Sequence, residues 1–232
     1  TYGSVVAPFV TDVSGYLADA AASGKNIMFE AQLGALRDID FGIYPYTSSS
    51  TTLAAYAPIG AGIPGARLNN TIGIMKAYST CVGEGPFTVE LFGDEAEQLR
   101  AAGGEYGAAT GRPRRVGPFD VPASRYGVRM QGASTIALTK LDVLSYLDRI
   151  PVCVAYEIDG QRTTDFPTGE RLNRAKPVIE YVDGFGDVSQ CRSYNDLPEN
   201  AKRYISTLEQ AVGCRIEYVS VGAGRDEYVK ID

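Results

Sequence analysis

Short apolar segments alternate with segments of helical spacing along most of this chain, and that order restricts its fold more than any other feature. The helical segments carry start and stop signals: Pro198 stands in the first turn of one, and Gly213 follows its end. Because strands that alternate with helices pair mostly in parallel, we expect an α/β fold with a mostly parallel sheet and flanking helices. The expected helices are one that Thr11 or Asp12 caps and that runs to Ala22, then 94–102, 124–130, one that begins over 143–147, and 197–212. The expected strands are 26–29, 71–77, 135–138 and 215–221.

Two segments depart from this alternation. Strand-like runs at 152–158 and 161–165 flank Asp159-Gly160, a dipeptide typical of a two-residue turn, so we expect a β-hairpin excursion there. Residues 31–69 are rich in Gly, Ser, Thr, Pro and Tyr and show no helical or strand period. We expect this segment to wind over the surface as a functional loop.

The composition limits the partners. The 232 residues carry 22 Lys and Arg against 28 Asp and Glu, a formal net charge of −6. Because nucleic-acid binding requires a broad basic face, we expect no nucleic-acid partner. No apolar run approaches the length of a membrane span, so we expect no membrane partner either. The four cysteines form no Cys-x-x-Cys pair and are expected to be buried, reduced thiols of a cytoplasmic protein, with no metal site.

The chain contains no histidine. This absence removes the usual general base, the usual metal ligand and any Ser–His or Cys–His nucleophile from these residues. Any catalysis must rest on carboxylates, arginines and backbone dipoles, or on residues supplied from elsewhere.

Three arginines lie within four residues in the motif Thr-Gly-Arg-Pro-Arg-Arg at 110–115, behind Gly107. Crowded guanidinium groups repel one another unless anions neutralise them, and their planar forks match phosphate or carboxylate oxygens. A solvated loop is the alternative reading. The segment 139–142, Thr-Lys-Leu-Asp, favours a nucleotide site, because it follows an apolar strand where α/β sheets place ligands. The Asp142 carboxylate could accept from both guanine donors or could simply cap the next helix.

Two further motifs are weaker. The turn Ser-Val-Gly-Ala-Gly-Arg at 220–225 could close over a base or ribose, although a plain strand exit is as typical of its glycines. Asp38 and Asp40 would face the same way in an extended chain and could bind a metal, although solvated or Arg-paired acids are commoner.

Taken in order, several motifs resemble those of the adenylosuccinate synthetase family, and the resemblance covers nearly the whole chain. They are Phe-Glu at 29–30, Asp-Ile-Asp-Phe-Gly at 38–42, Tyr-Pro-Tyr at 44–46, Lys-Ala-Tyr at 76–78, Val-Gly-Glu-Gly-Pro-Phe at 82–87, the arginine motif, Leu-Thr-Lys-Leu-Asp-Val-Leu at 138–144, Cys-Val-Ala-Tyr at 153–156 and Leu-Pro-Glu-Asn-Ala at 197–201. The resemblance implies a truncated P-loop-NTPase-like fold, with residues 1–232 as the C-terminal part of a single synthetase-like domain.

The family joins IMP and L-aspartate at the expense of GTP, with Mg²⁺, to form adenylosuccinate for AMP synthesis. By resemblance, IMP would be contacted by Gln32, Ser48, Val82 and Arg112. Aspartate would be held by Ala108, Ala109, Thr110, Gly111, Arg112, Pro113 and Arg114. GTP would be bound by Arg114, Lys140, Leu141, Asp142, Ser220, Val221 and Gly222. The family's phosphate loop, its catalytic Asp and His and its Mg²⁺ ligands are expected upstream of Thr1, so no catalytic or metal-binding residue is expected here. A homodimer is expected of the full-length protein.

The departures from the family pattern fall at ligand-facing positions. The IMP glutamine is either displaced to Gln32 or replaced by Leu33, and an arginine of the family is Cys81 here; Thr51, Ala109 and Pro118 are further departures. The sequence is therefore compatible with two functions. One is a ligase fragment that is inactive as an isolated chain; the other is a degenerate homologue that binds a guanine nucleotide or a partner without catalysis.

Overall fold

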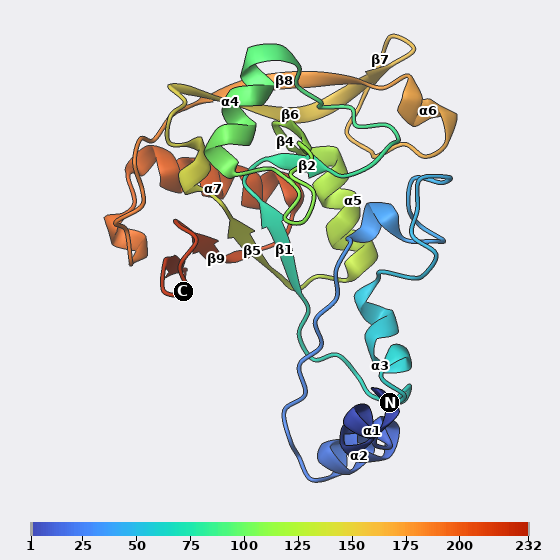
Figure 1. Cartoon of the computed structure of the whole chain (residues 1–232). Coiled ribbons are helices and arrows are strands. Elements are labelled where there is room, and N and C mark those ends of the chain that lie inside the picture. The colour runs from blue at the N-terminus through green and yellow to red at the C-terminus, as the bar shows by residue number, and fades with distance from the viewer. Residues whose placement is uncertain (1, 232) are drawn as a thin grey trace.

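A four-stranded sheet lies at the centre of the computed structural model, which describes residues 2–231 (Figure 1). Its strand order is β1-β5-β9-β10, with the first three parallel and β10 antiparallel at one edge. The strands are β1 (Ile72–Lys76), β5 (Thr135–Thr139), β9 (Ile216–Ser220) and β10 (Tyr228–Lys230). The parallel order brings the carboxyl ends of β1, β5 and β9 to one edge.

A second sheet is built around the longest strand. β6 (Arg149–Ile158) pairs in parallel with β4 (Phe119–Asp120) and antiparallel with β7 (Gln161–Thr163) and β8 (Lys176–Asp183). A smaller antiparallel pair joins β2 (Ser79–Cys81) to β3 (Arg115–Gly117). This pair lies near the second sheet (Figure 1). The chain passes from β1 through β2 to α4, and from α4 through β3 to β4 of the second sheet.

One hydrophobic core connects the two larger sheets through the helices. It joins Leu138 of β5 and Val219 of β9 to Leu208 of α7 and Val152 of β6. The helices of the body are α4 (Gly93–Gly103), α5 (Val121–Gln131), α6 (Glu170–Asn173) and α7 (Glu199–Val212), with short 3₁₀ turns η4 (Asp142–Leu144) and η5 (Tyr194–Asp196).

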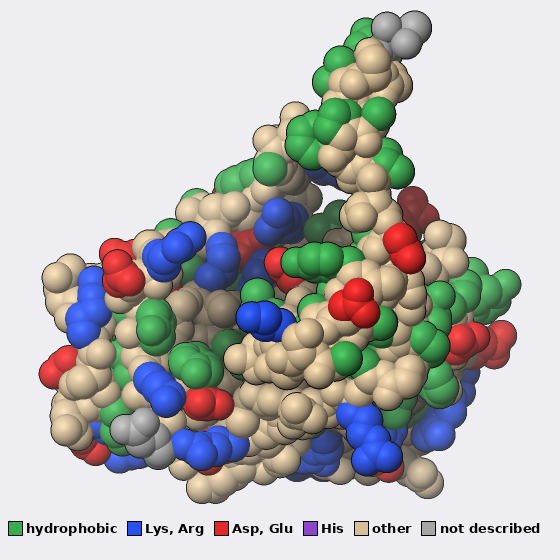
Figure 2. Space-filling model, turned by 90° about the horizontal axis from the view of Figure 1, so that it is seen from below, with side chains coloured by type: hydrophobic (Ala, Val, Ile, Leu, Met, Phe, Trp, Pro, Cys, Tyr) green, Lys and Arg blue, Asp and Glu red, His purple; other side chains and the backbone are tan. Residues whose placement is uncertain are grey.

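An arm projects from this body and carries few buried side chains (Figure 1). It contains α1 (Tyr2–Val6), η1 (Ala7–Phe9), α2 (Val13–Ala22), η3 (Ala54–Tyr56) and α3 (Ala57–Gly60), and η2 (Ala35–Arg37) lies where the chain returns to the body. Figure 2 shows hydrophobic side chains along the arm, where Tyr2 is 92% and Met28 91% exposed. Among residues 2–231, no helix combines the length and apolar character that crossing a bilayer requires.

Most of the predicted elements are confirmed. The predicted strands 71–77, 135–138 and 215–221 form the parallel part of the central sheet, and the helices predicted at 94–102, 124–130 and 197–212 are α4, α5 and α7. The hairpin is also confirmed: Asp159 has φ 53° and Gly160 φ 78°, the paired positive angles of a type I′ turn.

Three predictions are wrong. Residues 26–29 form no strand, because no described strand lies alongside to pair with them. The helix expected from 143–147 is only the single turn η4, since Val143 and Leu144 both turn into the core before β6 begins. The hairpin's second strand, β7, ends at Thr163 rather than at residue 165.

A buried carboxylate ties the second sheet to α5. Asp120 caps α5 by accepting the Ala123 N–H at 3.1 Å, and the Tyr156 hydroxyl donates to both of its oxygens at 2.8 and 2.7 Å. Burial raises the pKa of Asp120 to about 6, although these hydrogen bonds oppose the rise. A raised native pKa means that the folded state binds the proton more tightly than the unfolded state.

This linkage predicts a pH-dependent effect of Asp120→Asn. The wild-type free energy of unfolding should fall as pH rises from about 4 to 6, because Asp120 must ionise while buried. The asparagine carbonyl can accept both bonds without a charge. The variant should therefore gain roughly 3 kcal/mol relative to wild type between pH 4 and 7, measured by urea unfolding. Asp12→Asn, at the exposed cap of α2, is the control; a stability difference that does not change with pH would contradict the account.

Candidate functional site

Glu105 is fully buried, and four polar side chains converge on its carboxylate. Lys76 Nζ donates to both oxygens at 2.9 and 3.0 Å, and Arg114 Nη1 donates at 2.7 Å. Lys140 Nζ lies 3.2 Å from Oε1, and the Tyr78 hydroxyl donates at 2.5 Å. We call these five residues the Glu105 cluster. Three positive charges against one negative leave the cluster with an excess of two.

Each member of the cluster is placed by the end of an element. Lys76 is the last residue of β1, and Lys140 follows β5 with a left-handed φ of 61°. Glu105 follows Gly104, which caps the end of α4 in the left-handed conformation that glycine adopts easily. The parallel pairing of β1 with β5 therefore puts both lysines at the same sheet edge, where open α/β folds place ligands.

The electrostatics of the cluster keep Glu105 ionised. Burial alone would raise the pKa of its carboxyl group, but hydrogen bonds from Tyr78, Lys76 and Arg114 outweigh burial and lower the pKa to about 2. Burial lowers the pKa of Lys76, and Glu105 opposes that change. The partly exposed ammonium and guanidinium groups around this anion can still attract a second anion from solvent.

The predicted aspartate loop is a closed turn beside the cluster. The Gly107 N–H donates to the Arg112 carbonyl at 2.9 Å, and the Gly111 N–H donates to the Gly107 carbonyl at 2.8 Å. Gly111 has φ 64°, a left-handed conformation that glycine adopts without steric cost. The side chain of Arg112 is exposed, while Arg114 points inward to Glu105. The loop thus separates one arginine for solvent or ligand from one that is anchored.

The predicted guanine residues come together at the ends of β5 and β9. The Lys140 N–H donates to the Ser220 hydroxyl at 2.8 Å, and the Leu141 N–H donates to the Ser220 carbonyl at 3.1 Å. Val221 is buried behind them, and a Cβ at Gly222 would meet Glu227 Oε2 at 2.4 Å, so a larger residue there would displace the Glu227 side chain. Asp142 Oδ1 is buried and has no hydrogen-bond partner among residues 2–231, and burial raises the pKa of this carboxyl group.

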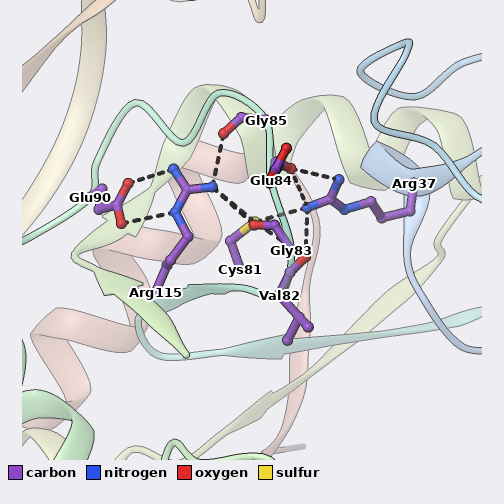
Figure 3. A network of polar contacts seen from close by, with 8 residues as sticks. All are labelled: Arg37, Cys81, Val82, Gly83, Glu84, Gly85, Glu90 and Arg115. Carbon is purple, nitrogen blue, oxygen red and sulfur yellow. Dashed lines mark hydrogen bonds and ion pairs between the residues drawn. The ribbon is translucent and has the colours of Figure 1, made fainter. Parts of the chain in front are cut away.

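The predicted IMP residues lie on separate loops. Gln32 lines an open hollow of about 390 Å³ together with Ser50 and Thr51. Ser48 Oγ is 3.3 Å from Ser50 Oγ, so it borders the same region. Val82, 70% exposed, lies on the segment after β2 (Figure 3). No hydrogen bond within residues 2–231 joins the Arg112 side chain to any of them.

The suggestion that Asp38 and Asp40 face one way is wrong. Asp38 is fully buried and accepts from the backbone N–H groups of Asp40, Phe41 and Thr52 at 2.9, 3.0 and 2.7 Å. Asp40 is exposed instead, because the chain turns here rather than extending. Among residues 2–231, no group of three or more His, Cys, Asp or Glu side chains is arranged to hold a metal ion.

Sequence reasoning missed two residues of the site. Glu105 lies between a glycine pair and a tyrosine, a context that resembles an ordinary helix exit. Arg37 lies in a loop without periodicity, yet its guanidinium group reaches the 81–85 segment (Figure 3). The cations around Glu105 come from three parts of the chain that are distant in sequence, so no residue spacing in the sequence indicates this cluster.

The comparisons with known proteins agree with this geometry. The family model for adenylosuccinate synthetase matches residues 1–229. The chain belongs to the adenylosuccinate synthetase family. Relatives named adenylosuccinate synthetase include one from Cutibacterium acnes, 47% identical over 229 residues, and one from Micrococcus luteus, 46% identical over 232. These alignments cover 98% and 99% of this chain but 54% of each relative, so the chain spans about half the length of the curated relatives it matches.

A solved structure gives the same result for the fold. The fully ligated adenylosuccinate synthetase from Plasmodium falciparum superposes with a TM-score of 0.94 at 36% sequence identity. The match covers 100% of this chain and 56% of that one. The expected α/β synthetase fold is therefore confirmed over the described residues, as about half of a family member.

The Glu105 cluster predicts a large cost for Glu105→Gln. The neutral amide would leave Lys76, Arg114 and Lys140 packed together without an anion, so the free energy of unfolding at pH 7 should drop by about 3 kcal/mol. Urea unfolding measures the drop. Wild type should lose the same contribution only as pH falls from about 4.5 through about 2, because the native pKa is depressed.

Glu97→Gln is the matched control, since Glu97 pairs with Arg100 on the surface of α4. Because solvent screens this exposed pair, Glu97→Gln should change the free energy of unfolding far less than Glu105→Gln does. Equal losses in the two variants would show that the Glu105 cluster is not a buried electrostatic unit.

Proposed function

We propose that this chain forms the guanine-reading and aspartate-holding part of a GTP-dependent ligase that joins IMP and L-aspartate into adenylosuccinate. Residues 1–232 would be the C-terminal part of one synthetase-like domain, in line with the share of each relative that the chain covers. A cytoplasmic homodimer is the corresponding proposal for the whole protein. The site lies at the carboxyl ends of β1, β5 and β9.

The unpartnered oxygen of Asp142 is the observation that carries this proposal. A buried acceptor without a donor costs free energy, and native structures rarely leave one. Guanine presents a ring N–H and an exocyclic amine side by side, and a carboxylate can accept from both. Burial raises the pKa of Asp142, whereas two hydrogen bonds donated by the base would lower it and favour the ionised carboxylate. Adenine presents no such pair.

The remaining GTP residues support this placement. Ser220 holds the backbone of Lys140 and Leu141, which fixes the start of η4 and thereby Asp142. Val221 and Gly222 continue β9 into the turn around Glu227. Arg114 and Lys140 share Glu105, so the proposed GTP side and the proposed aspartate loop are linked through one carboxylate.

For aspartate, we propose that the ligand's carboxylates meet the exposed Arg112 and the N–H groups of the 108–113 turn. The planar guanidinium fork matches a carboxylate in two parallel hydrogen bonds. Thr110 Oγ1 lies 3.3 Å from the Arg112 N–H and stabilises the turn on which Arg112 is carried. IMP would lie against Gln32, Ser48 and Val82, with Arg112 as its fourth contact.

Mg²⁺ accompanies GTP in this family, and its ligands are proposed to lie outside this chain. The acidic groups among residues 2–231 form no suitable cluster, and Asp38 is committed to backbone N–H groups. The chemistry assigned to this chain is therefore binding and orientation of anions.

Asp142→Asn tests the proposed base recognition. The amide cannot accept from both guanine donors, so the variant should bind GTP at least about tenfold more weakly, a loss of roughly 1.5–3 kcal/mol. It should partly admit a xanthine nucleotide, which presents an oxygen where guanine has its amine. Titration calorimetry with GTP, ATP and XTP measures these changes, with the exposed Asp148→Asn as control. Equal binding of GTP and ATP that the substitution does not alter would refute the assignment.

A turnover assay separates the ligase from a non-catalytic homologue. Residues 1–232 contain no histidine and no described cradle for the γ-phosphate, so the isolated chain should form no adenylosuccinate from IMP, aspartate and Mg·GTP. Adding the portion of the Cutibacterium acnes relative that this chain does not span should restore turnover. Activity of the chain alone would contradict this division of labour. GTP binding without any restored turnover would favour a homologue that binds nucleotide only.

A further inference from the structure

Two guanidinium groups hold the 81–85 segment from opposite sides (Figure 3). Arg37 donates to the carbonyl oxygens of Val82, at 2.8 Å, and Glu84, at 3.2 and 3.3 Å. Arg115 donates to the carbonyl oxygens of the two intervening glycines, at 3.2 and 2.8 Å. Successive carbonyl groups therefore point alternately to one arginine and to the other, which fixes the backbone on which the Val82 side chain stands.

The two arginines are neutralised differently. Arg115 forms a bidentate pair with Glu90, at 2.8 and 2.5 Å, and its guanidinium carbon lies 5.5 Å from the centre of the Phe87 ring. No carboxylate among residues 2–231 forms an ion pair with Arg37. Apart from Cys81 Sγ at 2.9 Å, its partners are carbonyl oxygens, so it is bound by the backbone that it organises. We call Arg37 and Arg115 together the clamp. Glu90 anchors Arg115, whereas Arg37 comes from the loop that precedes the Tyr-Pro-Tyr motif.

Arg37 also connects the 81–85 segment to the Tyr-Pro-Tyr loop. Its carbonyl oxygen accepts the Ser48 N–H at 2.7 Å, and its Nη1 donates to the Tyr46 carbonyl at 2.6 Å. The neighbouring Asp38 is buried and held by three backbone N–H groups, so the base of Arg37 is fixed. One residue thus holds the backbone of Ser48 through its main chain and that of Val82 through its side chain, although these positions are far apart in sequence.

We propose that Arg37 is the positioning residue that assembles the IMP side of the site, by setting the distance between the loops that carry Ser48 and Val82. This inference rests on the proposed function for the identity of the ligand. The side-chain partners of Arg37 are groups of the two loops themselves, and its role is to keep these loops in register before the nucleotide arrives. Preorganisation of this kind acts on affinity, because the loops need not be ordered when the ligand binds.

The guanidinium group of Arg37 lies against the thiol of Cys81. Arg37 Nη2 is 2.9 Å from Cys81 Sγ, so a longer side chain at position 81 would enter the volume that the Arg37 guanidinium now fills. The family resemblance places an arginine at position 81. A double variant with leucine at 37 and arginine at 81, which we call the exchange because it moves the guanidinium group to the other loop, would deliver that group to the same carbonyl oxygens from the opposite side.

The test compares Arg37→Leu, Arg37→Lys and the exchange Arg37→Leu with Cys81→Arg, with the exposed Arg162→Leu as matched control. Calorimetry with IMP and, separately, with GTP gives two dissociation constants for each protein. We expect Arg37→Leu to weaken IMP at least tenfold and GTP less than twofold. Arg37→Lys keeps the charge but loses the planar set of donors of the guanidinium group, and should weaken IMP binding about fivefold. The exchange should recover most of the IMP affinity, and the control should match wild type.

A second measurement needs no nucleotide. Cys81 is partly exposed and the other three cysteines are buried, so the alkylation rate of Cys81 reports on the clamp. This rate should rise at least fivefold in Arg37→Leu and at least twofold in Arg37→Lys, which keeps the inference testable if the leucine variant does not fold.

The outcomes separate the two proposals. Wild type that binds GTP but not IMP would refute the proposed ligand, while faster alkylation would still support the clamp. Wild type that binds IMP, with unchanged affinity in both Arg37 variants, would overturn the positioning role alone. An equal loss of IMP and GTP affinity would also overturn it, because it would indicate general destabilisation.

Discussion

The ion pairs of the buried Glu105 carboxylate are the interaction on which the rest of this site depends. Lys76, Arg114 and Lys140 come from three parts of the chain, and without an anion between them their mutual repulsion would destabilise the packing of the arginine loop against the ends of β1 and β5. Because Glu105 neutralises only one of the three charges, the assembly is stable and still positive. A single residue thus stabilises the fold and leaves a field that attracts anionic ligands.

The sheet explains why these groups could meet at all. Parallel strands deliver their following residues to one edge, and Ser220 after β9 then fixes the backbone at Lys140 and Leu141. The left-handed φ of Lys140 turns the chain sharply after β5, so Asp142 lies in η4 rather than continuing outward. Most hydrogen bonds that position residues 140–145 join backbone groups. Such hydrogen bonds persist when side chains are substituted.

The sequence predicted the parts of the structure that depend on local patterns. Periodicity and turn residues located β1, β5, β9, α4, α5, α7 and the Asp159-Gly160 turn. It failed where tertiary pairing decides: β8 alternates poorly and forms only because β6 lies beside it, while residues 26–29 have strand composition and no partner. In the site, motifs identified Lys140 and Asp142, but Glu105 and Arg37 act through partners distant in sequence, which a single chain read in order does not reveal.

The two sides of the site are held by different chemistry, and this difference bears on the departures from the family pattern. The proposed guanine side depends on the identity of Asp142, because only a carboxylate offers two acceptors with a charge. The proposed IMP side is shaped by carbonyl oxygens that any residue supplies, provided that a guanidinium group reaches them. With Cys81 in place of an arginine, the carbonyl oxygens of Val82 and Glu84 still have a guanidinium partner, because Arg37 reaches them from another loop. Substitutions that look like erosion in the sequence are, at this position, compatible with an intact geometry.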